Sequence, residues 1–462
     1  MSLRESVANF GRFAGRTVTE TIGGVERTRI VLVLAAVLAL SSADATTVGA
    51  AATPLRHSLH IDNTDIGLLV SITSIAAAIA SIPFGALADR VHRTWLLGGA
   101  IVLWGAAMLW SATVPDFEQL LLTRACLGGV SAVAGPVIAS LVGDYFPASE
   151  RGRIYGFVLA GELIGAGIGF AVTGEFAALS WRAAFVILAI PSFVLAWFVL
   201  RLREPRRGSH RGTEEQEPTD AQKLAAKQDI EPDEELVLHD DPRNLNLIEA
   251  ARYVLRIPTN VVLIVSSALG YFFLAGVQTF GVEFASRQYG IASEIANLLL
   301  LIVGVGAVGG VLAGGLVSDR LLRRGLLSAR VLVPALMAGV TVVLFLPPIF
   351  TTSATVAIPY LIVATFALSA QNPPLDAARL DVVVPLMWGR AEGIRTFLRT
   401  GAQALAPLLF GAVSDYVFGG GHNSLKWTFV VMLLPLVGSC VILASGLRTY
   451  PRDVATAAAS TS

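Results

Sequence analysis

Long apolar runs separated by short charged breaks make up most of the chain. A helix needs roughly 20 residues to cross a hydrocarbon core about 30 Å thick. On this criterion the pattern predicts twelve transmembrane helices, at residues 30–56, 65–88, 95–114, 117–144, 153–177, 182–202, 259–286, 293–317, 329–349, 355–384, 391–417 and 426–447. The chain is therefore predicted to be an all-α membrane protein.

The composition supports this class. Of the 462 residues, 54% are hydrophobic and 15% are charged, whereas soluble domains have about 25% charged residues. The formal net charge is zero, which gives no reason to expect a nucleic-acid partner. Two cysteines in apolar runs and six histidines without ligand spacing predict neither a disulfide framework nor a metal site. No phosphate-binding glycine loop or nucleophile–base pair is visible, so we expect neither an enzyme nor a cofactor.

The arginines set the expected orientation. If the N-terminus lies inside, most arginines of the breaks face the cytoplasm, and the outside loops carry only Arg56, Arg182, Arg287 and Lys426. An excess of arginine and lysine marks the cytoplasmic side. We therefore expect a multi-pass protein of a bacterial inner membrane with both termini in the cytoplasm.

The middle of the chain breaks the apolar pattern. It is acidic, punctuated by proline and poor in aromatic residues, and such a composition favours disorder. A segment at 245–258 has helical apolar spacing and is expected to lie along the membrane interface. Residues 3–18 form either a similar helix or a disordered tail. The expected organisation is an N-terminal cytoplasmic segment (1–29), a six-helix half (30–202), a cytoplasmic linker (203–258), a second six-helix half (259–447) and a cytoplasmic tail (448–462).

Two segments occur twice. "GALADRVHRT" aligns with "GGLVSDRLLRRG" when Asp89 is placed on Asp319. "GPVIASLVGDYFPASERGRIYG" aligns with "NPPLDAARLDVVVPLMWGRAEG" when Asp144 is placed on Asp381. The two six-helix halves are therefore predicted to be pseudo-symmetric repeats. Internal repeats of this kind are typical of secondary transporters.

The repeated charged turn resembles the loop after helix two of the major facilitator superfamily, although His92 replaces a usual glycine. The resemblance implies that Asp89 lies at the N-terminal end of span 11, and that Arg90 or Arg93 pairs with Asp144. In the second half it implies that Asp319 faces the start of span 5, with Arg320 or Arg324 near Asp381. The expected cytoplasmic gate comprises Asp89, Arg90, Arg93, Asp144, Arg153, Asp319, Arg320, Arg324, Asp381 and Arg390.

Charged residues inside the spans are candidates for function, because a charge at bilayer depth is costly. Asp44 is the leading candidate for a proton carrier, with a fixed Asp44–Arg124 ion pair as the alternative. "RACLGGVSA", which begins at Arg124, is similar to a span-4 motif of the family that is associated with proton coupling. Glu162 lies in a glycine-rich stretch that resembles the family's antiporter motif. Small residues at this spacing also simply permit close helix packing.

The second half contributes further polar groups. Asp376 and Arg379 are three residues apart on one predicted helix and could neutralise each other. Arg399 has no acid nearby in its own helix, which favours a role in binding an anion. The proton-coupling residues are expected to be Asp44, Glu162 and Arg124. The predicted substrate-binding residues are Asp44, Arg124, Glu162, Gln278, Asn372, Asp376, Arg379 and Arg399.

Two branches of the superfamily resemble the chain. "ADATTVGAAATP" is similar to span 1 of both drug:proton antiporters and Spinster-like transporters, and the stretch from Arg124 to Phe146 fits span 4 of the Spinster-like group, with Ser131 in place of that group's glutamate. The Spinster-like resemblance implies a monomeric, proton-coupled, alternating-access transporter of an amphiphile such as a lysophospholipid, driven by the proton gradient. The alternatives are multidrug efflux by a drug:proton antiporter, import of an organic anion, and a non-transporting membrane receptor.

Overall fold

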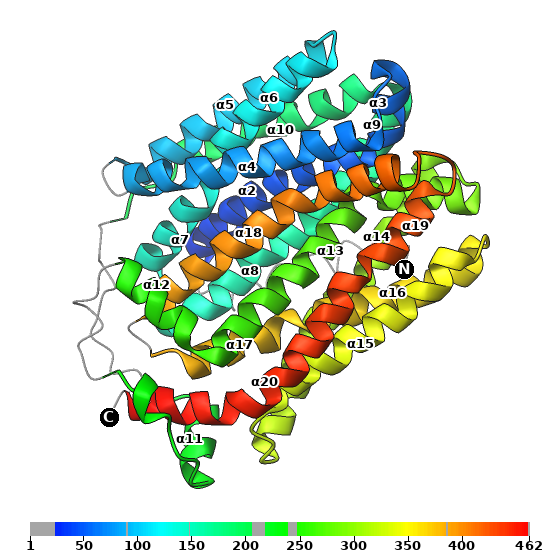
Figure 1. The fold of residues 1–462 in the computed structure, drawn as a ribbon. Coiled ribbons are helices and arrows are strands. Elements are labelled where there is room, and N and C mark those ends of the chain that lie inside the picture. Colours follow the sequence, from blue (N-terminus) through cyan, green and yellow to red (C-terminus); the bar gives the residue numbers. More distant parts are fainter. Residues whose placement is uncertain are drawn as a thin grey trace, which may run out of the picture. The chain divides into compact units, whose positions relative to one another are not determined.

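The computed structural model describes residues 24–88, 91–146, 148–205, 218–238, 247–384 and 387–460, which are helical almost throughout and contain no strand (Figure 1). The chain divides into two compact units. Residues 1–47 and 79–213 form the first unit, and residues 48–78 and 214–462 form the second. The boundary passes through the helices of spans 1 and 2. Residues 48–78, the end of span 1 and the first part of span 2, therefore belong to the unit that contains the second repeat.

The first repeat supplies six spans. They consist of α2 (Val25–Ala50) with α3 (Ala52–Leu59), α4 (Asn63–Ala88), α5 (Arg93–Thr113), α6 (Phe117–Ser131) with α7 (Ala134–Tyr145), α8 (Ala148–Ile168) with the π-helical turn η1 (Gly169–Thr173) and α9 (Gly174–Leu179), and α10 (Trp181–Leu200).

The second repeat supplies six more. They consist of α13 (Pro258–Tyr289), α14 (Ser293–Arg323), α15 (Ala329–Phe350), α16 (Ala354–Ala370) with α17 (Asn372–Val382), α18 (Trp388–Ala412) with the π-helical turn η5 (Val413–Val417), and α19 (Ser424–Met432) with α20 (Leu434–Ala459).

The predicted fold class is confirmed. Eleven helices in the described ranges are long and apolar enough to cross a membrane. The twelfth span, α18, is also long enough, but it carries Arg395 and Arg399. Spans 4 and 10 are both interrupted just before a matched proline, Pro136 or Pro373. Proline removes a backbone donor and crowds the preceding turn, so the same residue breaks the same helix in both repeats.

Rows of glycine allow the helices to pack closely. In the first unit, a Cβ atom on Gly161, Gly165 or Gly169 would lie less than 3 Å from the backbone of α2 at Ala35, Ala39 or Ala43. In the second unit, Gly306, Gly310 and Gly314 of α14 meet the carbonyls of Ile362, Phe366 and Ala370 on α16 in the same way. Figure 1 shows α14 and α16 side by side. Small residues at this spacing let helix backbones touch inside a membrane.

Part of the linker is folded, in contrast to the disorder that its composition predicts. Residues 220–227 form α11 (Asp220–Lys227), which begins with a capping box made by Thr219 and Gln222. Ala221 and Ala225 are buried, and Figure 1 shows α11 beside the end of α20. The segment around α11 folds because it shares the core of the second unit and does not have to bury a core of its own.

Two helical segments lie beyond the twelve predicted spans. The predicted interfacial helix is present as α12 (Leu247–Arg256), and it packs Ala250 and Val254 into the core of the second unit. The last helix continues to Ala459, through most of the predicted cytoplasmic tail, with Val454 and Ala457 buried. The possible helix at residues 3–18 lies outside the described residues.

We expect Gly165→Ala to destabilise the protein by about 2 kcal/mol, a typical cost of overpacking. The new Cβ would lie 2.1 Å from the Ala39 carbonyl oxygen, and this contact involves backbone that cannot rotate away. Thermal unfolding in detergent micelles measures the change. Gly129→Ala is the matched control, because no heavy atom lies within 4 Å of its new Cβ. Equal melting temperatures for the two variants would contradict the packing argument.

Candidate functional site

Asp44 and Arg124 form a buried ion pair in the first unit. Arg124 Nη1 on α6 lies 2.8 Å from Asp44 Oδ1 on α2. The two residues are only 1% and 3% exposed, respectively. The guanidinium lies 5.9 Å from the ring centroid of Phe185, and its Nε has no hydrogen-bond partner in the described part of the chain. A guanidinium held by a single carboxylate in apolar surroundings is sensitive to that carboxylate's charge.

Glu162 occupies a different environment. It follows Gly161 on α8, where the glycines pack against α2, and its side chain is exposed. The glycine row therefore acts in helix packing, which was one of the two readings of this motif. The structure shows only that the Glu162 side chain is accessible, so its role as a proton carrier stays a prediction.

Arg93 begins α5 and binds two acids in the first unit. Its Nη1 lies 2.5 Å from Asp144 Oδ2 and its Nε lies 2.7 Å from Glu204 Oε1. The expected pairing of Asp144 with Arg93 is therefore confirmed. Burial raises the pKa of the Glu204 carboxyl, but the Thr94 amide and the Arg93 guanidinium outweigh this effect, so the net pKa lies below the usual 4.5.

The second unit repeats this cluster with a different arginine from the one expected. Arg330 Nη1 donates to both oxygens of Asp381 at 2.7 Å, and Nη2 lies 3.1 Å from Asp319 Oδ1. The Tyr450 hydroxyl donates to the same Asp381 carboxylate. The expectation that Arg320 or Arg324 would lie near Asp381 is wrong in its choice of arginine.

The length of α14 explains the difference. The helix runs to Arg323, one turn past Asp319, so Arg320 lies in its last turn and Arg324 directly follows it. Both Arg320 and Arg324 are exposed. The arginine that reaches Asp381 is therefore the one in the first turn of α15, just as Arg93 occupies the first turn of α5.

The remaining gate residues are not tested. Asp89 and Arg90 lie outside the described residues, and so do the side chains of Arg153 and Arg390. Their gate roles stay predictions.

The polar residues of spans 7, 10 and 11 are spread over the second unit. Asp376 pairs with Arg395 of α18, and Arg379 donates to the Trp388 carbonyl at 3.3 Å. Gln278 and Asn372 are half-buried on α13 and α17. The expected pairing within α17 is thus replaced, for Asp376, by an ion pair to a neighbouring helix.

Arg399 of α18 has no carboxylate partner among the described residues. Its guanidinium lies 4.5 Å from the ring centroid of Tyr271 on α13, and its Nε is buried without a hydrogen-bond partner. A cation–π contact fixes a guanidinium but leaves its N–H donors unused. The anion-binding role that the sequence context of Arg399 favours stays a prediction.

Glu283 of α13 is the centre of a cluster that was not predicted from the sequence. Glu283 is 4% exposed and binds Arg56, Thr53 and Arg287. The signal was present, because Glu283 is an acid inside span 7 and Arg56 and Arg287 are two of the arginines assigned to the outside loops. The pairing itself depends on α3 packing against α13.

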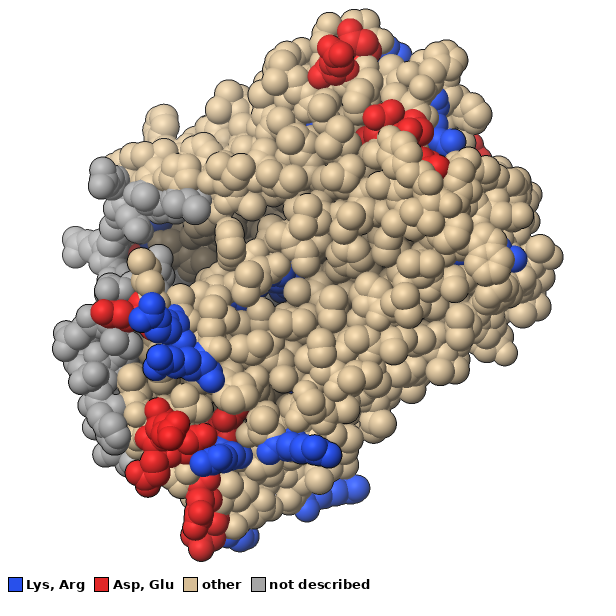
Figure 2. All heavy atoms as spheres, in the orientation of Figure 1, with Lys and Arg blue, Asp and Glu red and all other residues tan. Residues whose placement is uncertain are grey.

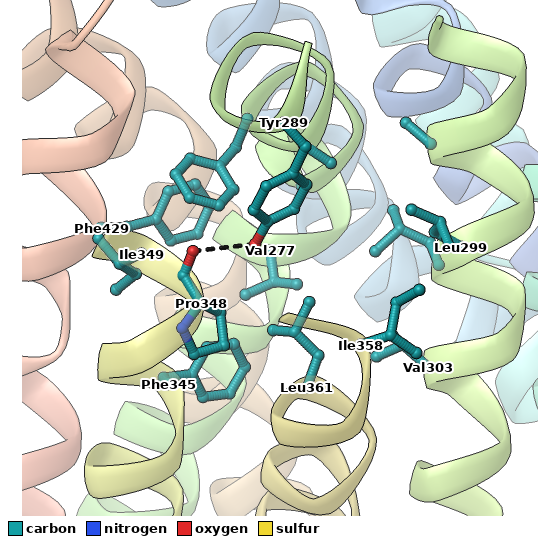
Figure 3. A pocket seen from close by; sticks show the side chains of 15 residues that line it. Val277, Tyr289, Leu299, Val303, Phe345, Pro348, Ile349, Ile358, Leu361 and Phe429 are labelled. Carbon is teal, nitrogen blue, oxygen red and sulfur yellow. Dashed lines mark hydrogen bonds between the residues drawn. The ribbon is translucent and has the colours of Figure 1, made fainter. Parts of the chain in front are cut away.

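An apolar cavity lies among the helices of the second unit (Figure 3). Its lining includes Phe284, Phe345 and Phe429. The Tyr289 hydroxyl donates to the Pro348 carbonyl at 2.9 Å, so this polar group in the cavity wall has a hydrogen-bond partner.

Figure 2 shows that uncharged side chains cover most of the visible surface, as expected for helices that face lipid.

The fold and the buried ion pairs define a multi-pass membrane transporter. A family model described as Major Facilitator Superfamily matches residues 34–378. The chain belongs to this family, which consists of transporters and not enzymes, and which implies a lipid bilayer and a small-molecule substrate.

Several relatives refine the placement. The chain is 29% identical over 177 residues to a probable L-galactonate transporter of Escherichia coli, covering 38% of this chain and 39% of the relative. It is 27% identical over 202 residues to protein spinster of Drosophila melanogaster, covering 43% and 33%. Less than half of the length of these two relatives is therefore matched. The hexuronate transporter of Bacillus subtilis is 25% identical over 387 residues, which is 80% of this chain and 84% of that one.

One solved structure has the same fold. It is a bacterial homolog of the human lysosomal transporter Spinster in an inward-facing, unoccupied conformation. The TM-score is 0.76 at 19% identity, over 93% of this chain and 98% of that one. This structure shows a shared fold, and the sequence match to protein spinster confirms the resemblance to Spinster-like members of the superfamily.

We expect Arg330→Gln to destabilise the protein by about 3 kcal/mol, because it would leave the buried Asp381 carboxylate without its cation. Arg320→Gln is the matched control and should have little effect, since Arg320 is exposed. Thermal unfolding in micelles distinguishes the two variants. The reverse order would restore the original assignment of Arg320.

Glu204 gives a prediction of pH dependence. Its folded pKa is below the usual 4.5, so the stability it contributes is present above that pH and is lost as pH falls through the folded value. The difference in unfolding free energy between wild type and Glu204→Gln should be constant from neutral pH to about 5 and should shrink in more acidic buffer. A difference that grows on acidification would contradict this assignment.

Proposed function

We propose that the protein is a proton-coupled secondary transporter of an organic anion, with a lysophospholipid as the first candidate substrate. The observation that carries the proposal is the buried Asp44–Arg124 pair, together with Arg399, whose guanidinium stacks on Tyr271 and has no carboxylate partner in the described part of the chain. In the first site, the charge of the Asp44 carboxylate determines whether the positive charge of Arg124 is neutralised. The other offers a cation whose hydrogen-bond donors are unused.

Charge balance relates these two features. With Asp44 ionised, the pair with Arg124 is neutral. Protonation of Asp44 leaves a net positive charge in an apolar environment, and an anion restores neutrality. The proton and an anionic substrate therefore favour each other's binding and travel in the same direction. A cationic drug would instead compete with the proton at Asp44 and travel in the opposite direction.

The Spinster-like resemblance favours a lysophospholipid, whose phosphate is the anionic group that Arg399 would bind. A second candidate is a sugar acid, because two relatives are named as L-galactonate and hexuronate transporters. Both candidates carry an anionic group that Arg399 would bind. Drug efflux remains the alternative for a cationic substrate.

The proposed orientation of the chain in the membrane follows from its charged residues. The arginine bias of the breaks favours both termini in the cytoplasm of a bacterial inner membrane. With this topology the clusters around Arg93 and Arg330 lie on the cytoplasmic side. We propose that the protein works as a monomer by alternating access.

We expect Asp44→Asn to abolish substrate-linked proton movement, because the asparagine cannot change charge. The assay records internal pH in proteoliposomes after addition of lysophosphatidylglycerol, lysophosphatidylethanolamine, glucuronate or a lipophilic cationic dye. An anionic substrate should carry protons inward with it, and a cation should drive them outward. Identical traces for wild type and Asp44→Asn would exclude Asp44 as the carrier. Binding without any flux would favour a receptor.

Arg399→Gln should raise the half-saturating concentration of the anionic substrate about tenfold or more, since a hydrogen bond to a charged group contributes roughly 1.5–3 kcal/mol. Arg320→Gln is the control for a general loss of positive charge. An unchanged concentration dependence in Arg399→Gln would place the anion elsewhere.

A further inference from the structure

The carboxylate of Glu283 in the second unit binds partners from two different helices. Arg56 Nη1 on α3 lies 2.6 Å from Glu283 Oε1, and the Thr53 hydroxyl of the same helix donates to Oε2. Arg287, one turn further along α13, places Nε and Nη2 2.7 Å from Oε1. Glu283 therefore has one cation on its own helix and one on a helix of the other repeat.

The surrounding backbone is closely packed. A Cβ atom on Gly49 would lie 2.3 Å from the Gln278 carbonyl oxygen, and the neighbouring Thr279 is only 3% exposed. A second acid also joins the two repeats, since Asp415 Oδ2 of η5 accepts from the Thr64 amide at 2.6 Å and from its hydroxyl at 2.8 Å. A carboxylate at the N-terminus of α4 is favoured by the helix dipole.

These contacts join the outer parts of spans 1 and 2 to spans 7 and 11 at one end of the second unit. Glu283 lies near the end of α13 that is remote from α12, which precedes the start of α13 at Pro258. In the orientation proposed above this end faces the outside. Alternating access, on which this inference rests, requires α3 to separate from α13 when the outside opens.

We infer that the two arginines act in opposite directions on this opening. Arg56 is the exchangeable partner: it holds the outer end closed and passes into water when α3 leaves α13. Arg287 is the resident partner: it stays one turn from Glu283 in both states and makes opening possible.

The asymmetry follows from the number of partners that remain. In the closed state Glu283 has Arg56, Arg287 and Thr53. After separation only Arg287 remains. Removing Arg287 therefore costs more in the open state, where it would leave an uncompensated carboxylate, than in the closed state. Removing Arg56 affects the closed state alone, and its side chain is already 24% exposed.

The test measures exposure of the contact between α2 and α13. Thr279→Cys is introduced after Cys126→Ser and Cys440→Ala, and a membrane-impermeant maleimide is added to right-side-out vesicles and, separately, to inside-out vesicles. Arg56→Gln should speed labelling from the outside about tenfold, the equivalent of about 1.4 kcal/mol. Arg287→Gln should slow it about threefold or more, and Arg287→Lys, which keeps the charge at the same spacing, should restore the parent rate.

Arg182→Gln is the matched control. Arg182 is also assigned to the outside, but its partners belong to the first unit, where it donates to the Val114 carbonyl and stacks on Trp181. Labelling at the parent rate is expected. Faster labelling in both Arg56→Gln and Arg287→Gln would overturn the inference, because Arg287 would then be a second closing contact. A loss of reactivity in Arg287→Gln that Arg287→Lys does not reverse would overturn it as well.

Labelling needs no substrate, so its outcome is separate from that of the proposed function. Opposite effects of the two arginines support the inference even if no tested compound moves protons. The same split seen only in inside-out vesicles supports the roles of the arginines and reverses the proposed orientation.

Discussion

The structure depends on one constraint, which is that a charge in an apolar environment must have a partner. Arg93 and Arg330 illustrate it most clearly. Each begins the third span of its repeat and binds the acid at the end of the fourth, Asp144 or Asp381. Removing one member of such a pair would strand the other, so these pairs hold the helix ends of each unit in place.

The close approach of the helices makes the buried pairs possible. Glycines at every fourth position bring α8 against α2 and α14 against α16 until the backbones touch. Lipid provides no hydrophobic drive for helices to associate, so close van der Waals contact and polar pairs must hold them together. Asp44 is placed on α2 in the same stretch that the glycines of α8 contact, within reach of Arg124. The packing that fixes the fold thus also positions the proposed proton carrier.

The buried ion pairs differ in how many partners each charge has. Asp381 is held by an arginine and a tyrosine of its own unit, which suits a permanent contact. Arg124 has one carboxylate partner and an unused Nε, so its surroundings change strongly with the charge of Asp44. Glu283 has partners on two helices that belong to different repeats, which suits a contact that forms and breaks. The number and origin of the partners therefore separate the structural charges from those that we assign to transport.

The sequence determined the features that depend on local pattern. Run length and hydropathy gave the twelve spans, the repeated motifs gave the two halves, and the charges in spans 1 and 4 identified Asp44 and Arg124. Only the tertiary structure decided the pairings. The residues between Asp319 and Arg330 contain no pattern that tells which arginine reaches Asp381, because this depends on where α14 ends. Glu283 and Arg56 lie far apart in the chain, and so do the linker helix α11 and the helix α20 on which it packs. No local pattern predicts contacts of this kind. Local periodicity determines where a helix forms and which residues share a face. Which charges pair depends on which helix faces pack together, and that is decided by the tertiary structure.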